Sequence, residues 1–188
     1  MSENSPFFTV GHSTRSVAGL ASLLREAGAE LVADVRTIPR SRANPQFNAD
    51  TLPEALAAFD IAYRPIPRLG GLRGRRMGAG PSPNGFWENE SFRNDADYAL
   101  TPPFREGLAE LLALGRERVC AVMCAEAVWW RCHRRIIADY LLVEGETVLH
   151  IMGPGKIEPA RMTPAAVRRA DGALAYPQGG TAPMPAEE

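Results

Sequence analysis

The residues best suited to chemistry lie between Cys124 and Arg134, where the sequence reads CAEAVWWRCHR. A cysteine thiolate is a strong nucleophile, and nearby arginines and the N-terminus of a helix stabilise it. An imidazole titrates near neutral pH, and a carboxylate can orient it. We therefore predict Cys124 as a nucleophile, with His133 and Glu126 managing the protons. The alternative is that Cys124 is a small buried core residue like Cys120.

Further groups with catalytic potential occur elsewhere in the chain. His12 follows an apolar run at 7–10, and Asp34 ends a second run two residues before Arg36. His12 is another candidate for general acid/base catalysis, and Asp34 could orient it. The alternative is that Asp34 only holds Arg36 in place. For His150, which lies between two apolar residues, we predict a buried position in the core.

Several arginines predict a site for an anion. Guanidinium groups match pairs of phosphate oxygens, backbone N–H groups at a helix start add donors, and flanking aromatic rings could stack on bases. The alternative is that the arginines are solvated or paired with carboxylates, and that the aromatic rings belong to the core. The predicted anion-binding residues are Ser13, Arg36, Arg40, Arg42, Arg73 and Arg134, and the candidate stacking residues are Phe47, Phe86, Trp87 and Trp129.

A metal site is a further alternative. Zinc accepts thiolate and imidazole ligands, and Cys124, Cys132 and His133 together with His12 could supply them. However, the chain lacks the short C-x2-C spacing of structural zinc sites. In addition, neighbouring residues 132 and 133 would point about 100° apart on a helix. We therefore predict no cofactor and keep a divalent metal as an alternative.

The overall composition is that of an ordinary soluble domain. The chain has 188 residues, of which 45% are hydrophobic and 23% charged, and this favours one domain. The formal net charge of -1 argues against a protein that coats polyanions, although local basic patches remain possible. Three cysteines form a poor disulfide framework and favour a reducing, cytoplasmic compartment. No apolar run approaches the ~20 residues of a membrane helix, so no membrane association is expected, and the sequence does not indicate an oligomeric state.

The order of the expected elements predicts an α/β fold. It favours a single domain with a mainly parallel, Rossmann-like open sheet of about five strands and helices on both faces. We expect an N-terminal tail at 1–6, the α/β domain at 7–152 and a Pro/Ala/Gly-rich C-terminal tail at 153–188. The expected strands are 7–10, 30–35, 61–66, 119–124 and 147–152, and the expected helices are 17–24, about ten residues from 51, 91–100, 101–114 and 136–144.

Local signals add three expectations. Thr51 and Glu54 have the spacing of a capping box. The segment 68–85 is rich in glycine and arginine, and it is a candidate lid or anion-binding loop. Beyond the last strand, we expect one short helix after Thr163 and a loosely held chain from Gly172 onward.

Several separated motifs resemble one known family. They are VGHSTR at 10–15, DVRTIPRSRANPQFN at 34–48, LGG at 69–71, CAEAVWWRCHR at 124–134 and HI at 150–151. Together they resemble the family catalogued as domain of unknown function 488 (DUF488), over about residues 7–152. The resemblance implies the α/β fold and selects the same site residues, but it names no reaction.

The sequence thus predicts an enzyme with a crevice at the carboxyl ends of the strands, where such folds bind ligands. Its substrate would be an anionic small molecule or a nucleic acid, with a phosphate-like or nucleotide-like group held by the arginines. Cys124 or an activated water would attack it. One competing hypothesis is a non-catalytic module that binds nucleic acid or protein through the same arginines. The other is a metal-dependent hydrolase with Cys and His ligands.

Overall fold

A six-stranded sheet forms the centre of the computed structural model, which describes residues 5–75, 78 and 80–179. The strand order is β3-β2-β4-β1-β5-β6. The first five strands in the chain pair in parallel, which confirms the prediction of a mainly parallel sheet in an α/β domain. The sixth pairs antiparallel with β5, so the sheet is mixed and has six strands, whereas a Rossmann-like sheet of about five strands was predicted. The strands are β1 (Phe7–Gly11), β2 (Leu31–Asp34), β3 (Ala62–Pro65), β4 (Cys120–Cys124), β5 (Val148–Gly153) and β6 (Lys156–Pro159).

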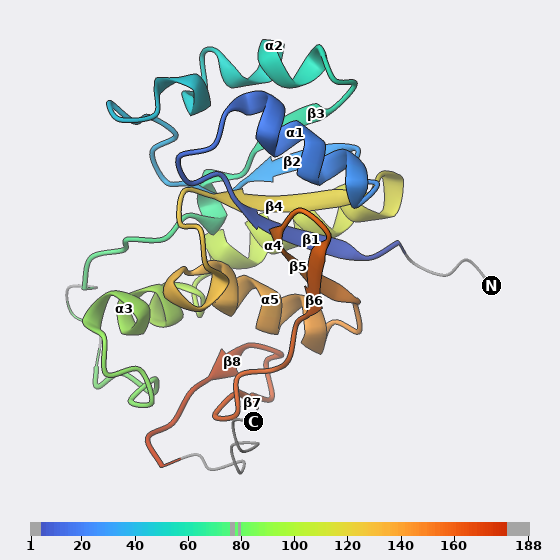
Figure 1. Ribbon diagram of the computed structural model, residues 1–188. Coiled ribbons are helices and arrows are strands. Elements are labelled where there is room, and N and C mark those ends of the chain that lie inside the picture. Colours follow the sequence, from blue (N-terminus) through green and yellow to red (C-terminus); the bar gives the residue numbers. More distant parts are fainter. Residues whose placement is uncertain (1–4, 76–77, 79, 180–188) are drawn as a thin grey trace.

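Helices cover both faces of the sheet, as predicted (Figure 1). On one face lie α1 (Val17–Glu26) and α2 (Leu52–Ala57), and on the other lie α4 (Pro102–Glu117) and α5 (Arg134–Val143). A shorter helix, α3 (Glu90–Tyr98), and three 3-10 turns, η1 (Pro45–Phe47), η2 (Pro67–Leu69) and η3 (Trp129–Arg131), lie in the connections.

The burial pattern of β4 follows from this arrangement. All five of its side chains are buried, and they alternate between the two faces of the sheet. Cys120, Val122 and Cys124 pack in the core beneath α4 and α5. Ala121 and Met123 pack in the core beneath α1 and α2. The strand therefore has the continuous apolar sequence that is typical of a strand covered on both sides.

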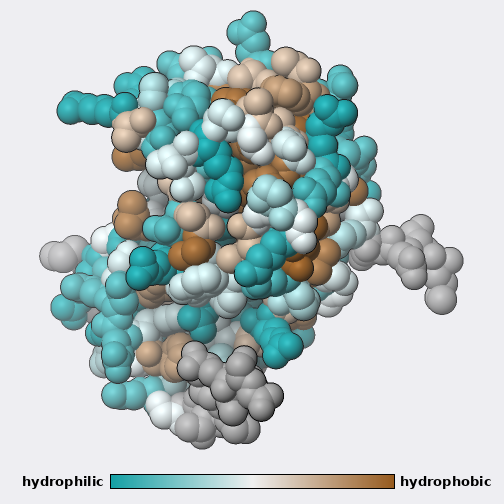
Figure 2. All heavy atoms as spheres, in the orientation of Figure 1, coloured by the Kyte–Doolittle hydropathy of each residue, from teal (hydrophilic) through white to brown (hydrophobic). Residues whose placement is uncertain are grey.

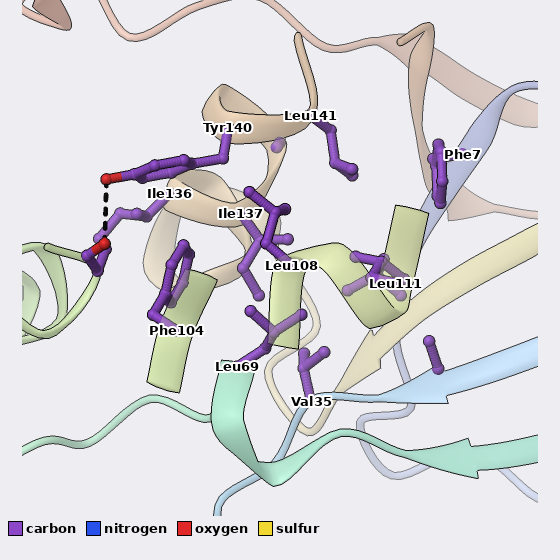
Figure 3. Packing of buried hydrophobic residues seen from close by; sticks show 14 of the residues in the cluster. Phe7, Val35, Leu69, Phe104, Leu108, Leu111, Ile136, Ile137, Tyr140 and Leu141 are labelled. Carbon is purple, nitrogen blue, oxygen red and sulfur yellow. Dashed lines mark hydrogen bonds between the residues drawn. The ribbon is translucent and has the colours of Figure 1, made fainter. Parts of the chain in front are cut away.

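The larger core fixes the position of α5. Ile137 and Leu141 on this helix belong to the same buried cluster as Leu108 and Leu111 on α4 (Figure 3). The Tyr140 hydroxyl also donates a hydrogen bond to the Ala99 carbonyl oxygen, 3.3 Å away. These contacts hold α5 against the core, and the N-terminus of this helix borders the candidate site.

The C-terminal segment differs from the expected loose tail. It contains a hairpin of two short strands, β7 (Val167–Arg168) and β8 (Leu174–Ala175), and residues 164–179 contain no helix. Tyr176 is buried, and its hydroxyl donates to Asp139 Oδ2 at 3.0 Å. The prediction was wrong for residues 163–179 because strands of two residues are too short to show a hydrophobic period. Residues 1–4 and 180–188 of the expected tails lie outside the described residues.

The prediction of a capping box at Thr51 was wrong. The Thr51 hydroxyl donates to the carbonyl oxygens of Pro45 and Asn48 and does not cap α2. None of the helices in the described part of the chain is long and apolar enough to cross a membrane. Hydrophilic side chains cover much of the face seen in Figure 2, with smaller hydrophobic areas between them.

Candidate functional site

A cavity of about 480 Å³ opens where β1, β2 and β4 end. Its wall brings together residues from the turn after β1, the loop after β2, α3, and the segment between β4 and α5. The predicted site residues in this wall are His12, Arg36, Arg40, Cys124, Glu126 and His133. The other predicted site residues, Ser13, Asp34, Arg42, Arg73 and Arg134, do not line it.

Arg134 lies behind this wall and not on it. Only 1% of its surface is exposed, so it cannot bind a substrate as the sequence predicted. Its Nε donates to Cys124 Sγ at 3.0 Å, and its Nη2 donates to the Glu126 carbonyl oxygen at 2.5 Å. Its Nη1 donates to the Thr9 hydroxyl at 3.4 Å. The guanidinium therefore faces a thiol, a carbonyl and a hydroxyl.

This buried guanidinium has no carboxylate partner among the described residues. An arginine cannot lose its proton in a protein, and an unpaired buried charge is costly. The groups beside Arg134 that can carry a negative charge are the thiols of Cys124 and Cys132, whose charges also raise the Arg134 pKa. This arrangement favours one thiolate shared between the two cysteines.

Cys124 and Cys132 both line the cavity, and each sulfur accepts a hydrogen bond from Arg134. They differ in their other partners. The Cys124 thiol donates to the Glu126 carbonyl oxygen at 3.9 Å. Cys132 Sγ receives the backbone N–H of Arg134 at 3.5 Å, at the N-terminus of α5, and it lies 3.5 Å from His133 Nδ1. Both the helix dipole and the imidazole therefore favour a negative charge on Cys132.

The pKa values of the two thiols shift in opposite directions. Burial and the neighbouring Cys132 sulfur raise the pKa of the Cys124 thiol well above its ordinary value. Burial alone would also raise the pKa of Cys132, but Cys124, His133 and Arg134 outweigh it and hold that pKa well below its ordinary value. The sequence predicted Cys124 as the nucleophile, whereas this geometry favours Cys132.

His133 is oriented for proton transfer with Cys132. Its Nε2 donates to the Val35 carbonyl oxygen at 2.9 Å, which leaves Nδ1 facing the sulfur. Burial would lower the pKa of His133, but the Cys132 sulfur and the Asp95 carboxylate outweigh it and raise that pKa. The two residues can therefore exist as a thiolate and an imidazolium.

The expected divergence of Cys132 and His133 was wrong because neither residue lies in the helix. Cys132 has an extended backbone, with φ -129° and ψ 147°, and His133 is the residue that precedes α5. A change of backbone conformation between the two residues replaces the regular helical rotation. Their side chains can therefore meet on the same wall.

Gly71 fixes the ring of His133 from the other side. Replacing Gly71 by alanine would place a Cβ 2.6 Å from His133 Cγ and Nδ1. We expect the ring to move and to lose its contact with Cys132, so that the pKa of His133 falls. The free energy of unfolding should fall by about 1 to 3 kcal/mol. An NMR titration of the imidazole protons and unfolding in urea measure the two effects.

Gly74→Ala is the matched control for this prediction, because nothing lies within 4 Å of a Cβ at that position in the same loop. This variant should keep the wild-type pKa of His133. An unchanged His133 titration in Gly71→Ala would show that Gly71 does not position the ring.

Asp34 and Arg36 form a second buried network beside the cavity. Asp34 Oδ1 receives Arg36 Nε at 2.9 Å, and Asp34 Oδ2 receives Arg36 Nη2 and the Tyr63 hydroxyl, each at 2.6 Å. Arg36 Nη1 lies 3.3 Å from His12 Nε2. The ring of His12 stacks on Phe47 at 4.2 Å, and burial lowers its pKa. This network corresponds to the alternative in which Asp34 holds Arg36.

The remaining predicted anion-binding residues have different surroundings. Arg73 donates to the carbonyl oxygens of Gly70 and Pro67 and lies over the ring of Tyr98. Arg42 is exposed outside the cavity, whereas Arg40 is exposed and lines it.

The four candidate stacking residues do not form an exposed surface. Phe47 and Trp87 are buried in the core, which contradicts a role in base stacking. Phe86 packs edge-on against Trp87, and Trp129 stacks on His150 at 4.5 Å. His150 is buried, as predicted, and its Nδ1 lies 2.7 Å from the Thr9 hydroxyl.

Two charged residues of the cavity wall, Asp95 and Arg131, were not among the predicted site residues. Asp95, on α3, receives the backbone N–H of Arg73 at 2.9 Å, and burial raises its pKa. No pattern in the sequence connects α3 with the segment before α5. Arg131, at the end of η3, is exposed and lines the cavity. Its position one residue before Cys132 was the available signal.

The alternative metal site finds no ligand group in the described part of the chain. No three His, Cys, Asp or Glu side chains come together there in a way that could hold a metal ion. Cys124, Cys132 and His133 do meet, but the guanidinium of Arg134 lies against the first sulfur.

Comparison with known proteins gave one result. A family model described as "Domain of unknown function DUF488" matches residues 16–141, a range that includes Cys124, Cys132 and His133. Neither the curated proteins nor the solved structures contain a match to the chain.

Proposed function

The chain belongs to the DUF488 family, and from the chemistry of its site we propose that it is an enzyme that uses Cys132 as a nucleophile. The observation that carries the proposal is the buried Arg134, which donates to Cys124 Sγ and has no carboxylate partner among the described residues. A thiolate in a cavity wall is the form in which cysteine attacks substrates.

The proposed step needs only groups of the cavity wall. The Cys132 sulfur forms a bond to the electrophilic atom of the substrate while the bond to the leaving group breaks. The protonated Nδ1 of His133, 3.5 Å from the sulfur, gives its proton to the leaving group. Water then releases the covalent intermediate, and the imidazole takes a proton from that water. Glu126 has an exposed side chain in the same wall and is a candidate for a substrate contact.

We further propose that the substrate is an anionic small molecule. Arg40 and Arg131 line the cavity with exposed side chains, and their guanidinium groups suit phosphate or carboxylate oxygens. The volume of about 480 Å³ is within the range of small-ligand sites. A cytoplasmic location is part of this proposal, because a reducing compartment keeps such thiols free.

Alkylation of the cysteines tests this proposal without a known substrate. Iodoacetamide should modify Cys132 first, and the midpoint of its rate against pH should lie below that of N-acetylcysteine measured in parallel, because the thiolate is the reactive form. Cys120 should stay unmodified, since burial raises its pKa to about 11. Peptide mapping by mass spectrometry identifies the modified residue, and Cys132→Ser should remove the fast phase.

A charged reagent tests the anion site in the same experiment. Iodoacetate carries a carboxylate, so its rate relative to that of iodoacetamide should fall severalfold in Arg131→Ala and Arg40→Ala. Arg42→Ala is the matched control, because Arg42 is exposed outside the cavity. If Cys132 reacts no faster than N-acetylcysteine at neutral pH, the proposal that Cys132 is the nucleophile is wrong. A non-catalytic binding module then becomes the better hypothesis.

A further inference from the structure

We propose that Cys132 and Cys124 are an oxidation site, at which a hydroperoxide converts the two thiols into a disulfide. This inference rests on the reactive Cys132 of the proposed function, and it adds a second reaction of the same sulfur together with a role for Cys124. It starts from geometry, since both cysteines line the same cavity and each sulfur accepts a hydrogen bond from Arg134.

Arg134 holds the two sulfurs together. Its side-chain Nε donates to Cys124 Sγ at 3.0 Å, and its backbone N–H reaches Cys132 Sγ at 3.5 Å. Cys124 ends β4, whose five side chains are all buried, and Cys132 lies two residues before the start of α5. Both sulfurs are therefore held beside Arg134, and a disulfide forms when one sulfur moves to the other.

The first step consumes one molecule of peroxide. The Cys132 thiolate attacks the outer peroxide oxygen, so that an S–O bond forms and the O–O bond breaks. The departing hydroxide or alkoxide takes a proton from His133 Nδ1. Cys132 becomes a sulfenic acid, and the peroxide has been reduced by two electrons.

The loss of charge on Cys132 activates the second thiol. Once Cys132 is a neutral sulfenic acid, Cys124 is the only counter-charge left for the buried guanidinium of Arg134 among the residues that the structure describes. The Cys124 thiol, which is protonated in the reduced pair, then loses its proton more readily. Its sulfur attacks Cys132 Sγ, so that the S–S bond forms, the S–O bond breaks and hydroxide leaves as water with the proton that Cys124 released.

The disulfide in turn removes the counter-charge of Arg134. Neither sulfur can then carry a negative charge, and the guanidinium stays buried. We therefore expect an external dithiol to reduce the disulfide readily, as is typical of labile disulfides. The pair would form a reversible oxidation site that blocks the nucleophile while it is oxidised.

The test treats the full chain with one equivalent of hydrogen peroxide. The wild type should lose two free thiols per molecule, show a Cys124–Cys132 disulfide in a peptide map without reduction, and recover all three thiols with dithiothreitol. In Cys124→Ser, dimedone should trap a sulfenic acid on Cys132. Cys120→Ser is the matched control, and it should form the same disulfide as the wild type. Cys124→Ala serves as the second variant if the serine disturbs folding.

The outcomes separate this inference from the proposed function. Fast alkylation of Cys132, together with a wild type that forms no Cys124–Cys132 disulfide, would overturn the oxidation site and leave the nucleophile in place. Slow alkylation at neutral pH would overturn the nucleophile itself. A disulfide that includes Cys120, or a Cys124→Ser variant that gives no dimedone adduct on Cys132, would also contradict the oxidation site.

Discussion

Replacing both Cys124 and Cys132 by alanine is expected to lower the free energy of unfolding by about 3 to 5 kcal/mol, beyond the loss that the two truncations cause by themselves. The reason is Arg134, which is 1% exposed and has no carboxylate partner among the described residues. Without the two thiols, the guanidinium would be a buried charge with only carbonyl and hydroxyl partners. Unfolding in urea at pH 7 measures the effect.

Cys120→Ala measures the cost of truncation alone. Cys120 is buried in the same strand and the same core as Cys124. Its replacement therefore removes a similar sulfur and leaves a similar small void. Twice the loss of unfolding free energy measured in Cys120→Ala is the reference for the double variant of Cys124 and Cys132.

Adding Arg134→Met to the double variant should restore most of the lost stability. Methionine fills a similar volume without a charge, and replacing buried charges by apolar residues is often neutral or stabilising. A double variant that loses no more than twice the Cys120→Ala effect would show that the thiol pair does not balance Arg134. There would then be no structural reason to expect a thiolate shared between Cys124 and Cys132.

The sheet and its two helical layers could be predicted because each central strand is covered on both faces. The run Cys120 to Cys124 is apolar without a break, which is typical of such a strand. The regular alternation of strands and helices then predicted parallel pairing. The antiparallel β6, with no fully buried residue, and the two-residue strands β7 and β8 gave no comparable signal.

The edge of the sheet at which the cavity lies could also be predicted, but the contacts of its residues could not. Parallel strands place His12, Asp34 and Cys124 at one edge of the sheet, and this follows from element order alone. The role of Cys132 depends on the extended backbone before α5, which the sequence pattern assigned to a helix. The burial of Arg134 depends on the route of the loop that brings the Glu126 carbonyl to its side chain. Neither the extended backbone at Cys132 nor the burial of Arg134 produces a hydrophobic period or a residue spacing that can be recognised in the sequence.

Asp34→Ala is expected to lower the free energy of unfolding by about 3 to 5 kcal/mol. Asp34 is 1% exposed, and it accepts two side-chain hydrogen bonds from Arg36, which is 8% exposed. Removing the carboxylate leaves Arg36 with the Phe47 carbonyl oxygen and His12 as its partners. It also removes the acceptor of the Tyr63 hydroxyl. Urea unfolding at pH 7 measures the loss.

Two further variants separate the ion pair from its neighbours. Tyr63→Phe removes one hydrogen bond and leaves the pair intact, so it should cost only about 1 kcal/mol. The double variant Asp34→Leu with Arg36→Met removes both charges, and it should be clearly more stable than Asp34→Ala. If the double variant is no more stable than the single one, the cost would come from lost packing and not from an unpaired guanidinium.

The Asp34→Ala variant also tests whether Asp34 takes part in the chemistry of the candidate site. Asp34 does not line the cavity, and its side chain forms hydrogen bonds with Arg36 and Tyr63 and not with Cys132 or His133. The rate of Cys132 alkylation in folded Asp34→Ala should therefore stay close to that of the wild type, even though the protein unfolds at lower urea. A large loss of Cys132 reactivity with an unchanged stability would contradict this view and would return Asp34 to the catalytic role that the sequence predicted. Stability and reactivity are thus expected to separate at Asp34, whereas they are expected to change together at the thiol pair, where the same charge serves both.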